Sequence, residues 1–337
     1  MAFLEFKNVR IAGISAGVPK HVVSNLRPDS QDGTSKDYSP EDFVKTTGVK
    51  ERHVSDTLCT SDLSYAAAEQ LISDLEWDKS EIEAIIFVSQ TADYFLPCTA
   101  CILQNRLGLS KECYAFDCSL GCSGWVYGLS QVASLMSAGT IRKALLLCGD
   151  AKKRAKGSLD PLFGHAGTAT AVEFQEGEQG FRFHFGTDGS GYDAIIIPDG
   201  GSRNQITQKS FELEEIDGKM IHRLQTHMNG MDVFGFGIST APKTVKKLAE
   251  HYGYDYLDSD YYVFHQANMK MNNMIVKKLK LPPEKVPSCM YEFGNTSSAS
   301  IPLTIVTQLR DRANMRTKYT CCGFGVGLSW GTVYFET

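Results

Sequence analysis

The chain has 337 residues, a formal net charge of −5 at pH 7, 42% hydrophobic residues and 22% charged residues. This length can bury a large core, in two domains or in two halves of one, and the composition is that of a globular protein. The acidic balance argues against nucleic acid or a membrane surface as the main partner, and no apolar run is long enough to span a bilayer. Residues 1–13 alternate apolar and charged side chains instead of forming a signal-peptide core, so we expect a first strand there.

Short apolar strands alternate with amphipathic helices along the rest of the chain, which predicts a layered α/β fold. In the first half we expect helices from Ser61, Pro97 and Cys122 and strands over 82–88, 113–118 and 144–148. A polar, glycine-bearing break over 176–180 predicts a boundary between two halves, 1–178 and 179–337. In the second half we expect a helix over 232–251, a strand over 261–264, helices after Asn268 and Asn295, and a glycine-rich hairpin over 323–327 that leads into a strand over 328–335.

Ten cysteines are spread over this long chain, which fits reduced thiols in a cytoplasmic protein better than a disulfide framework. Cys98-x-x-Cys101 and the adjacent Cys321-Cys322 are candidate metal ligands. A structural zinc site needs a second spaced pair or spaced histidines, and the sequence has neither at suitable spacing. We therefore expect no metal site and interpret Cys98 and Cys101 as packed residues of a helix.

Three polar residues occupy points where strands end and helices begin. Cys122 lies in a Gly-Cys-Ser-Gly turn between a strand and a helix, where helix N–H groups favour a thiolate. His265 follows the strand 261–264, and Asn295 precedes a helix. Ligands of open α/β sheets bind outside the carboxyl ends of the strands, so these positions suit a shared site. Taken singly, a packed cysteine, a structural histidine and a helix-capping asparagine are each the more common interpretation.

The motifs around these residues resemble those of the β-ketoacyl-acyl carrier protein synthase III family. They are Gly-Cys-Ser-Gly at 121–124, His-Gln-Ala-Asn at 265–268, Gly-Asn-Thr-Ser-Ser-Ala-Ser at 294–300 and Gly-Phe-Gly-Val-Gly-Leu-Ser-Trp-Gly at 323–331. Their order and spacing agree with the family, and weaker similarity extends to 47–52 and 163–172. The resemblance implies the thiolase fold, in which two similar halves stack as five layers, α-β-α-β-α, and a homodimer.

The resemblance also implies a decarboxylative condensation. Cys122 would carry an acyl group taken from a thioester, and the backbone N–H groups of Cys122 and Val326 would stabilise the oxyanion. His265 and Asn295 would donate hydrogen bonds to the carbonyl of a malonyl-type thioester. No resident cofactor is implied, because the substrates are carried on the phosphopantetheine of acyl carrier protein or coenzyme A.

Substrate and partner residues are also implied by the resemblance. Leu96 matches a position that walls the acyl pocket of the partner subunit, where the family often has phenylalanine. Lys270 matches a position that meets phosphopantetheine or the carrier protein. With Lys277 and Lys278 it would form a basic docking surface for an acidic acyl carrier protein, although most such charge runs are simply solvated.

Other functions remain open at this point. The chain could transfer acyl groups to an oxygen or nitrogen acceptor without decarboxylation. A papain-like cysteine peptidase also uses Cys, His and Asn in this order, but Cys122 lies far from the N-terminus. A non-catalytic partner subunit of a synthase pair would usually lack the nucleophile, which this chain retains.

Overall fold

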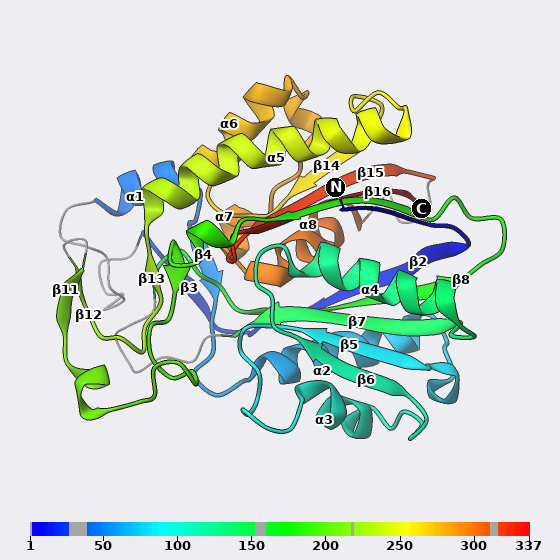
Figure 1. Cartoon of the computed structure of the whole chain (residues 1–337), viewed down its shortest axis with the longest axis horizontal. Coiled ribbons are helices and arrows are strands. Elements are labelled where there is room, and N and C mark those ends of the chain that lie inside the picture. Colours follow the sequence, from blue (N-terminus) through cyan, green and yellow to red (C-terminus); the bar gives the residue numbers. More distant parts are fainter. Residues whose placement is uncertain (1, 27–38, 152–159, 217–218, 311–315) are drawn as a thin grey trace.

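The structure is a computed structural model that describes residues 2–26, 39–151, 160–216, 219–310 and 316–337. Its helices and sheets stack as five layers, α-β-α-β-α (Figure 1). One outer layer is formed by α5 (Gly230–Tyr252) and α6 (Met269–Leu279), and the other by α2 (Thr60–Asp74) and α3 (Thr99–Arg106). Between the two sheets lie α4 (Gly124–Ala138) and α8 (Ser300–Gln308). The layered α/β architecture expected from the sequence is therefore confirmed.

The first sheet has the strand order β2 (Val9–Gly17), β8 (Ala166–Phe174), β7 (Lys143–Asp150), β5 (Ala84–Val88) and β6 (Tyr114–Cys118). Strand β5 pairs in parallel with both β6 and β7, and all five of its residues are buried. This continuous apolar strand is typical of a sheet covered on both faces. Helices α2 (Thr60–Asp74) and α3 (Thr99–Arg106) cover the outer face, and α4 (Gly124–Ala138) covers the inner face.

The second sheet has the order β1 (Ala2–Phe6), β9 (Phe181–Thr187), β16 (Ser329–Glu336), β15 (Lys318–Gly325) and β14 (Tyr261–Phe264). Its outer face carries α5 (Gly230–Tyr252) and α6 (Met269–Leu279), and its inner face packs on α4 and α8 (Ser300–Gln308). Trp125 of α4 is fully buried in the core between the sheets, where its ring lies 6.3 Å from that of Phe335.

The beginning of the chain differs from the prediction of one strand over residues 1–13. It forms two strands, β1 and β2, which belong to different sheets. Asn8 separates them with φ 61°, a left-handed conformation that asparagine tolerates better than most residues. Alternation of apolar and charged residues indicated extended backbone correctly but not this break.

Two further expectations were wrong in detail. Helix α2 begins at Thr60, with Cys59 as its N-cap, and the Asp62 carboxylate accepts a hydrogen bond of 2.8 Å from the Cys59 N–H. Cys98 is the N-cap of α3, and both Cys98 and Cys101 are exposed, so core packing does not account for this pair.

Within the described residues, no three His, Cys, Asp or Glu side chains are grouped to hold a metal ion. In the same part of the chain, no helix is long and apolar enough to cross a membrane.

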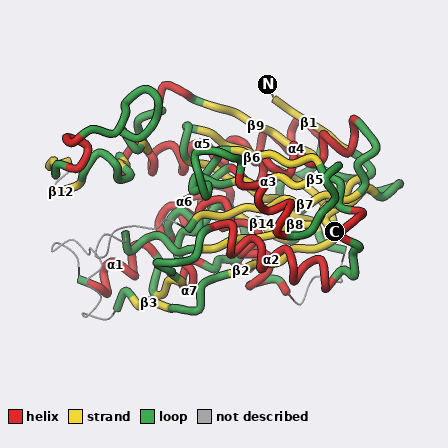
Figure 2. The backbone as a smooth tube through the Cα atoms, turned by 90° about the horizontal axis from the view of Figure 1, so that it is seen from below, coloured by secondary structure: helices red, strands yellow, loops and turns green. Residues whose placement is uncertain are grey.

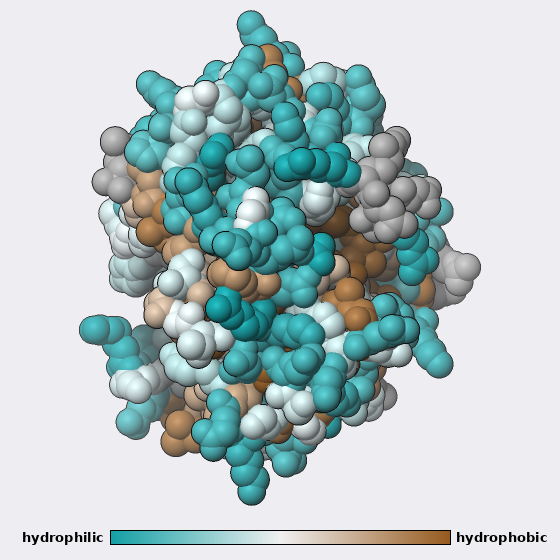
Figure 3. All heavy atoms as spheres, turned by 90° about the vertical axis from the view of Figure 1, so that its right-hand side faces the viewer, coloured by the Kyte–Doolittle hydropathy of each residue, from teal (hydrophilic) through white to brown (hydrophobic). Residues whose placement is uncertain are grey.

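Residues 188–216 and 219–229 leave the layered body and form what we call the arm. The arm projects on the same side as α1 (Pro40–Thr47) (Figures 1 and 2). Its strands are β10 (Ile195–Ile196), β11 (Glu214–Ile216), β12 (Lys219–Ile221) and β13 (His227–Met228), paired as β10–β13 and β11–β12. Figure 3 shows the face at the right of Figure 1, which is the side away from the arm. Hydrophilic side chains predominate on this face, and apolar ones form separate small patches.

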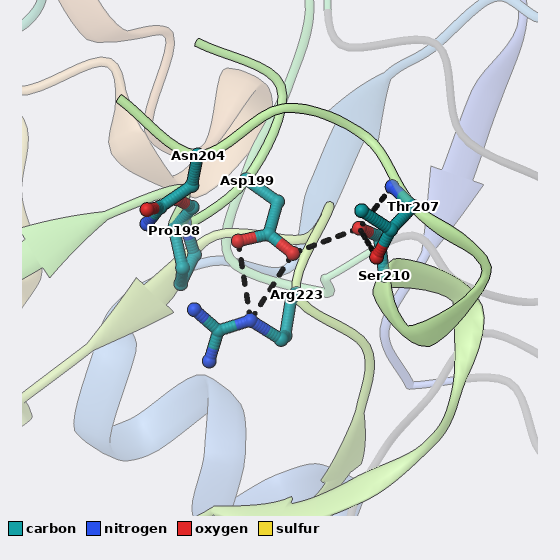
Figure 4. A network of polar contacts seen from close by, with 6 residues as sticks. All are labelled: Pro198, Asp199, Asn204, Thr207, Ser210 and Arg223. Carbon is teal, nitrogen blue, oxygen red and sulfur yellow. Dashed lines mark hydrogen bonds and ion pairs between the residues drawn. The ribbon is translucent and has the colours of Figure 1, made fainter. Parts of the chain in front are cut away.

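An ion pair braces the arm (Figure 4). The Arg223 Nε–H donates to both carboxylate oxygens of Asp199 at 3.1 Å, and the Ser210 hydroxyl donates to Oδ2 at 2.8 Å. The hydrogen bond from Arg223 first, and then that from Ser210, lowers the pKa of Asp199. These bonds link three separate segments of the arm, at Asp199, Ser210 and Arg223.

The remaining elements are short connections. They are β3 (Val22–Ser24), β4 (Glu51–His53), α7 (Met290–Phe293) and the 3₁₀ turns η1 (Lys79–Glu81), η2 (Gly189–Gly191), η3 (Gln208–Phe211), η4 (Pro283–Lys285) and η5 (Ser297–Ala299). Strands β3 and β4 form a small antiparallel pair.

Candidate active site

Cys122 lies in the turn between β6 and α4, as the sequence predicts. The Gly124 N–H donates to the carbonyl of Gly121 at 2.7 Å, and α4 begins at Gly124 with Ser123 as N-cap. The half-buried thiol therefore precedes the first turn of α4, at the end of the helix where the macrodipole favours negative charge. The Ser123 hydroxyl lies 2.8 Å from that of Ser329, which ties this turn to β16.

The end of β15 passes directly over Cys122. A Cβ atom at Gly325 would lie 2.7 Å from Cys122 Cβ and 2.9 Å from its Sγ, and one at Gly323 would lie 2.8 Å from the Cys122 carbonyl oxygen. Only glycine fits at such distances, and the close approach places Val326 in the wall of the same cavity as the thiol. The sequence predicted the glycine-rich hairpin but not this role for Gly325.

His265 follows β14 and is 2% exposed. Its backbone N–H donates to the Cys322 carbonyl at 2.9 Å, and its ring Nδ1 lies 2.8 Å from the Ser300 hydroxyl. Burial lowers the pKa of His265 to about 3, against an opposing hydrogen bond to the Ser297 backbone. The imidazole is therefore neutral near pH 7 and carries a single ring N–H. When Nδ1 accepts a hydrogen bond from the Ser300 hydroxyl, that N–H is on Nε2, which can donate to a substrate.

Asn295 lies between α7 and η5, and both its backbone N–H and its backbone carbonyl are hydrogen-bonded. Its N–H donates to the Leu162 carbonyl at 2.9 Å, and its carbonyl accepts from the Gly164 N–H at 3.1 Å. Its side-chain Oδ1 accepts from the Ser297 N–H at 2.9 Å, which orients the amide and leaves Nδ2 as its donor. Asn295 is not the N-cap of α8, since that position is Ala299.

Cys122, His265 and Asn295, which are far apart in the sequence, line one cavity of about 120 Å³. The other lining residues include Phe163, Met228, Met271, Phe324 and Val326. A larger groove of about 1090 Å³ adjoins this cavity, and the two share Gln90, Ile195, Thr226 and Val326. Sequence reasoning missed Ile195, Thr226 and Met228, because the arm carries no motif that connects it with the thiol.

The predicted binding residues lie outside this cavity. Leu96 is 86% exposed in the loop before α3, beside Tyr94 and Phe95, which are 65% and 92% exposed. Lys270, Lys277 and Lys278 are exposed on α6. Asn268 and Met271, at the start of that helix, line the cavity, so α6 runs from the site to the surface.

The fully buried cysteines offer no competing nucleophile. Burial raises the pKa values of Cys289 and Cys322 to about 12 and raises those of Cys148 and Cys321 as well. A thiol is nucleophilic only as a thiolate, so these four are inert near pH 7. Cys122 differs from them in lining a cavity.

Family models match two parts of the chain. Residues 116–189 match "3-Oxoacyl-[acyl-carrier-protein (ACP)] synthase III", and residues 248–337 match the model of its C-terminal part. The chain is 32% identical to a β-ketoacyl-[acyl-carrier-protein] synthase III of Rhodopirellula baltica, over 98% of this chain and 99% of the relative. It is 30% identical to the protein of that name from Clostridium perfringens, over 98% and 99%.

The fold is also similar to that of solved structures. A 3-oxoacyl-(acyl-carrier protein) synthase from Burkholderia xenovorans superposes with a TM-score of 0.91 at 36% identity, over 100% of this chain and 96% of the other.

Proposed function

The chain belongs to the β-ketoacyl-acyl carrier protein synthase III family of the thiolase superfamily, and we propose how its residues carry out the condensation typical of a type III ketosynthase. In this proposal Cys122 takes an acyl group from a thioester and passes it to a malonyl-type extender. The observation that carries the proposal is that one cavity holds a thiol, a neutral imidazole and a side-chain amide.

The first half-reaction acylates Cys122. The thiolate attacks the thioester carbonyl, a new C–S bond forms, and the carrier's C–S bond breaks to release phosphopantetheine as its thiolate, which takes a proton from water. The tetrahedral oxyanion would accept hydrogen bonds from the backbone N–H groups of Cys122 and Val326. Two easier steps then replace one difficult condensation.

The second half-reaction uses His265 and Asn295. Their Nε2–H and Nδ2–H groups would donate to the thioester oxygen of the malonyl group. As the C–C bond to the carboxylate breaks and carbon dioxide leaves, its electron pair forms an enolate whose charge these donors stabilise. The enolate carbon attacks the acyl carbonyl and expels the Cys122 thiolate, giving a β-ketoacyl thioester. Neither donor needs to be charged, and no resident cofactor takes part.

Intact mass spectrometry after incubation with a panel of acyl thioesters tests this mechanism. The wild type should gain one acyl mass and Cys122→Ala should gain none, whereas Cys101→Ala, a control at an exposed thiol, should behave as the wild type. Adding malonyl thioester should then release carbon dioxide and restore the unmodified mass. Lack of acylation by any thioester, or cleavage of a peptide reporter, would refute the proposal. Acyl transfer to an alcohol or amine without release of carbon dioxide would favour the alternative reaction.

We also propose that an acidic acyl carrier protein docks on α6. The exposed Lys277 and Lys278 supply positive charge, and the start of the same helix lines the cavity that phosphopantetheine must reach. Complementary charge mainly speeds encounter, so reversing it should raise KM and leave kcat nearly unchanged. Lys277→Glu/Lys278→Glu should do so for carrier-bound substrate, and Lys111→Glu, near α3 in the opposite layer, should not. An unchanged KM would reject this docking surface.

Finally, we propose a homodimer. The loop with Tyr94, Phe95 and Leu96 exposes three large apolar side chains in a row, and β6 is an edge strand of its sheet in the described structure. Such features invite association with a second copy. Phe95→Glu/Leu96→Glu should shift the sedimentation coefficient to that of a monomer. A wild type that already sediments as a monomer would refute the dimer.

A further inference from the structure

Arg52, in β4, is a fully buried cation close to the candidate active site. It is 0% exposed and ranks among the largest completely buried side chains. Its Nε–H donates to Asn25 Oδ1 at 3.2 Å, and its Nη1 donates to the carbonyls of Asp160 and Phe163, both at 3.3 Å. A guanidinium is rarely buried without such partners, because its desolvation is costly. Its planar fork can hold several acceptors at fixed positions.

The carbonyls that Arg52 binds belong to the segment that is hydrogen-bonded to the backbone of Asn295. The Asn295 N–H donates to the Leu162 carbonyl at 2.9 Å, and the Gly164 N–H donates to the Asn295 carbonyl at 3.1 Å. Phe163 and Asn295 form an isolated parallel bridge. Asp160, Leu162 and Phe163 also line the cavity, so this short segment is both wall and support.

Asn25 reinforces the same segment. Its Nδ2 group donates to the Pro161 carbonyl at 2.9 Å and to the Val49 carbonyl at 3.0 Å, while its Oδ1 accepts from Arg52. Arg52 and Asn25 together therefore bind three carbonyls of residues 160–163. We call this pair the Arg52 clamp.

The clamp and the segment that it binds pack closely against the residue before Asn295. At the preceding residue, Gly294 (φ 65°), a Cβ atom would lie 2.8 Å from the Leu162 carbonyl oxygen and 3.3 Å from Arg52 Cγ. A change in the clamp would therefore move Leu162 and, with it, the backbone of Asn295. The Cys122 turn is supported separately, by α4 and by the Ser123–Ser329 contact.

We propose that Arg52 is a positioning residue for the decarboxylation half-reaction: its clamp on residues 160–163 holds the Asn295 amide in line with the thioester oxygen of the extender. The inference rests on the proposed function. It separates the two half-reactions, because acylation of Cys122 needs the oxyanion donors but not Asn295. A displacement of the donor by about 1 Å can cost roughly 100-fold in rate.

The test measures both half-reactions in Arg52→Lys, which keeps the charge but loses the fork. We expect the rate of Cys122 acylation to stay within about twofold of wild type and condensation to fall at least about tenfold. In a background of Asn295→Ala, the same substitution should have no further effect on condensation, because coupled residues are not additive. Asn25→Ser removes the amide that binds Pro161, Val49 and Arg52 but leaves the guanidinium and its bonds to Asp160 and Phe163. It should act in the same direction and replaces Arg52→Lys as the test if that variant does not fold.

Ser259→Ala is the matched control for a purely structural loss. It removes a buried hydroxyl that lies 2.7 Å from that of Thr320, before the start of β14 and so at the opposite end of that strand from His265. We expect it to lower Tm and to leave the ratio of the two half-reactions unchanged. The inference is overturned if Arg52→Lys and Asn25→Ser lower both half-reactions in proportion, or if Arg52→Lys and Asn295→Ala multiply in effect. If the wild type fails to acylate or condense, the proposed function fails instead.

Discussion

Gly325→Ala should slow the acylation of Cys122, because the new methyl group would collide with the thiol. The new methyl carbon would lie 2.9 Å from Cys122 Sγ and 2.7 Å from its Cβ. Ordinary contacts between heavy atoms of this kind are about 3.5–4.0 Å, so the thiol or the end of β15 must move by roughly 0.6–1.3 Å. A shift of this size at a reacting group costs about 100-fold in rate, or about 2.7 kcal/mol in activation free energy. The strain should also lower the free energy of unfolding by about 1–3 kcal/mol.

The assay is the rate of acyl incorporation at Cys122, followed by intact mass, together with a thermal melt. Gly235→Ala is the control, because a Cβ atom at Gly235 in α5 has no neighbour within 4 Å. Alanine should stabilise that helix by about 0.5–1 kcal/mol and leave acylation unchanged. If Gly325→Ala acylates within about threefold of the wild type with an unchanged Tm, then β15 does not constrain the thiol.

Three further predictions concern the neutral donors. The pKa of His265 is about 3 in the folded protein and 6.5 in a model peptide, so the unfolded chain binds more protons between these values, and stability falls as pH decreases through this window. His265→Gln should remove this contribution of His265 to the pH dependence. Between pH 7 and pH 5, the free energy of unfolding measured with urea should therefore fall by up to about 2 kcal/mol less in the variant than in the wild type. Equal decreases in the two proteins would contradict a lowered pKa of His265. Ser300→Ala, which removes the partner of the His265 ring, should lower the rate of malonyl decarboxylation about tenfold and spare acylation, and equal losses in both would point to misfolding instead. Asn295→Asp replaces a donor by an anion facing the enolate, so carbon dioxide release should fall at least about 100-fold while the acyl-enzyme still forms; retained decarboxylation would exclude Asn295 as a donor.

The sequence predicted the chemistry of the site better than its surroundings. Cys122, His265 and Asn295 could be recognised because the motifs around them together resemble those of one family. Their positions at strand ends and helix starts would, taken singly, have favoured structural roles. The Arg52 clamp could not be found in this way. Its acceptors in residues 160–163 are more than 100 residues away, and a lone arginine between polar neighbours looks like a surface residue until the fold buries it. The sequence also failed to predict the exposure of Cys98. Its segment was expected to pack in the core because of its apolar residues, whereas in the structure Cys98 and Cys101 are exposed.

The partner of a strand was equally hard to foresee. The alternation in residues 2–6 shows which side chains share a face but carries no information about which sheet the strand joins. Its pairing with β9 depends on residues 181–185, which lie beyond the whole first sheet in the sequence. Likewise, the walls contributed by the arm follow from how residues 188–229 return to the body, and no periodicity encodes that path.

The placement of β1 makes the two halves interdependent. Strand β1 is synthesised before β9, its neighbour in the second sheet, so about 175 further residues must be made before the two strands can pair. A protein cut between the halves would leave the later piece with β9 uncovered along one side, and uncovered strands recruit other chains. Separate synthesis of residues 179–337 should therefore give aggregates, and supplying the N-terminal piece in the same cell should keep it dispersed.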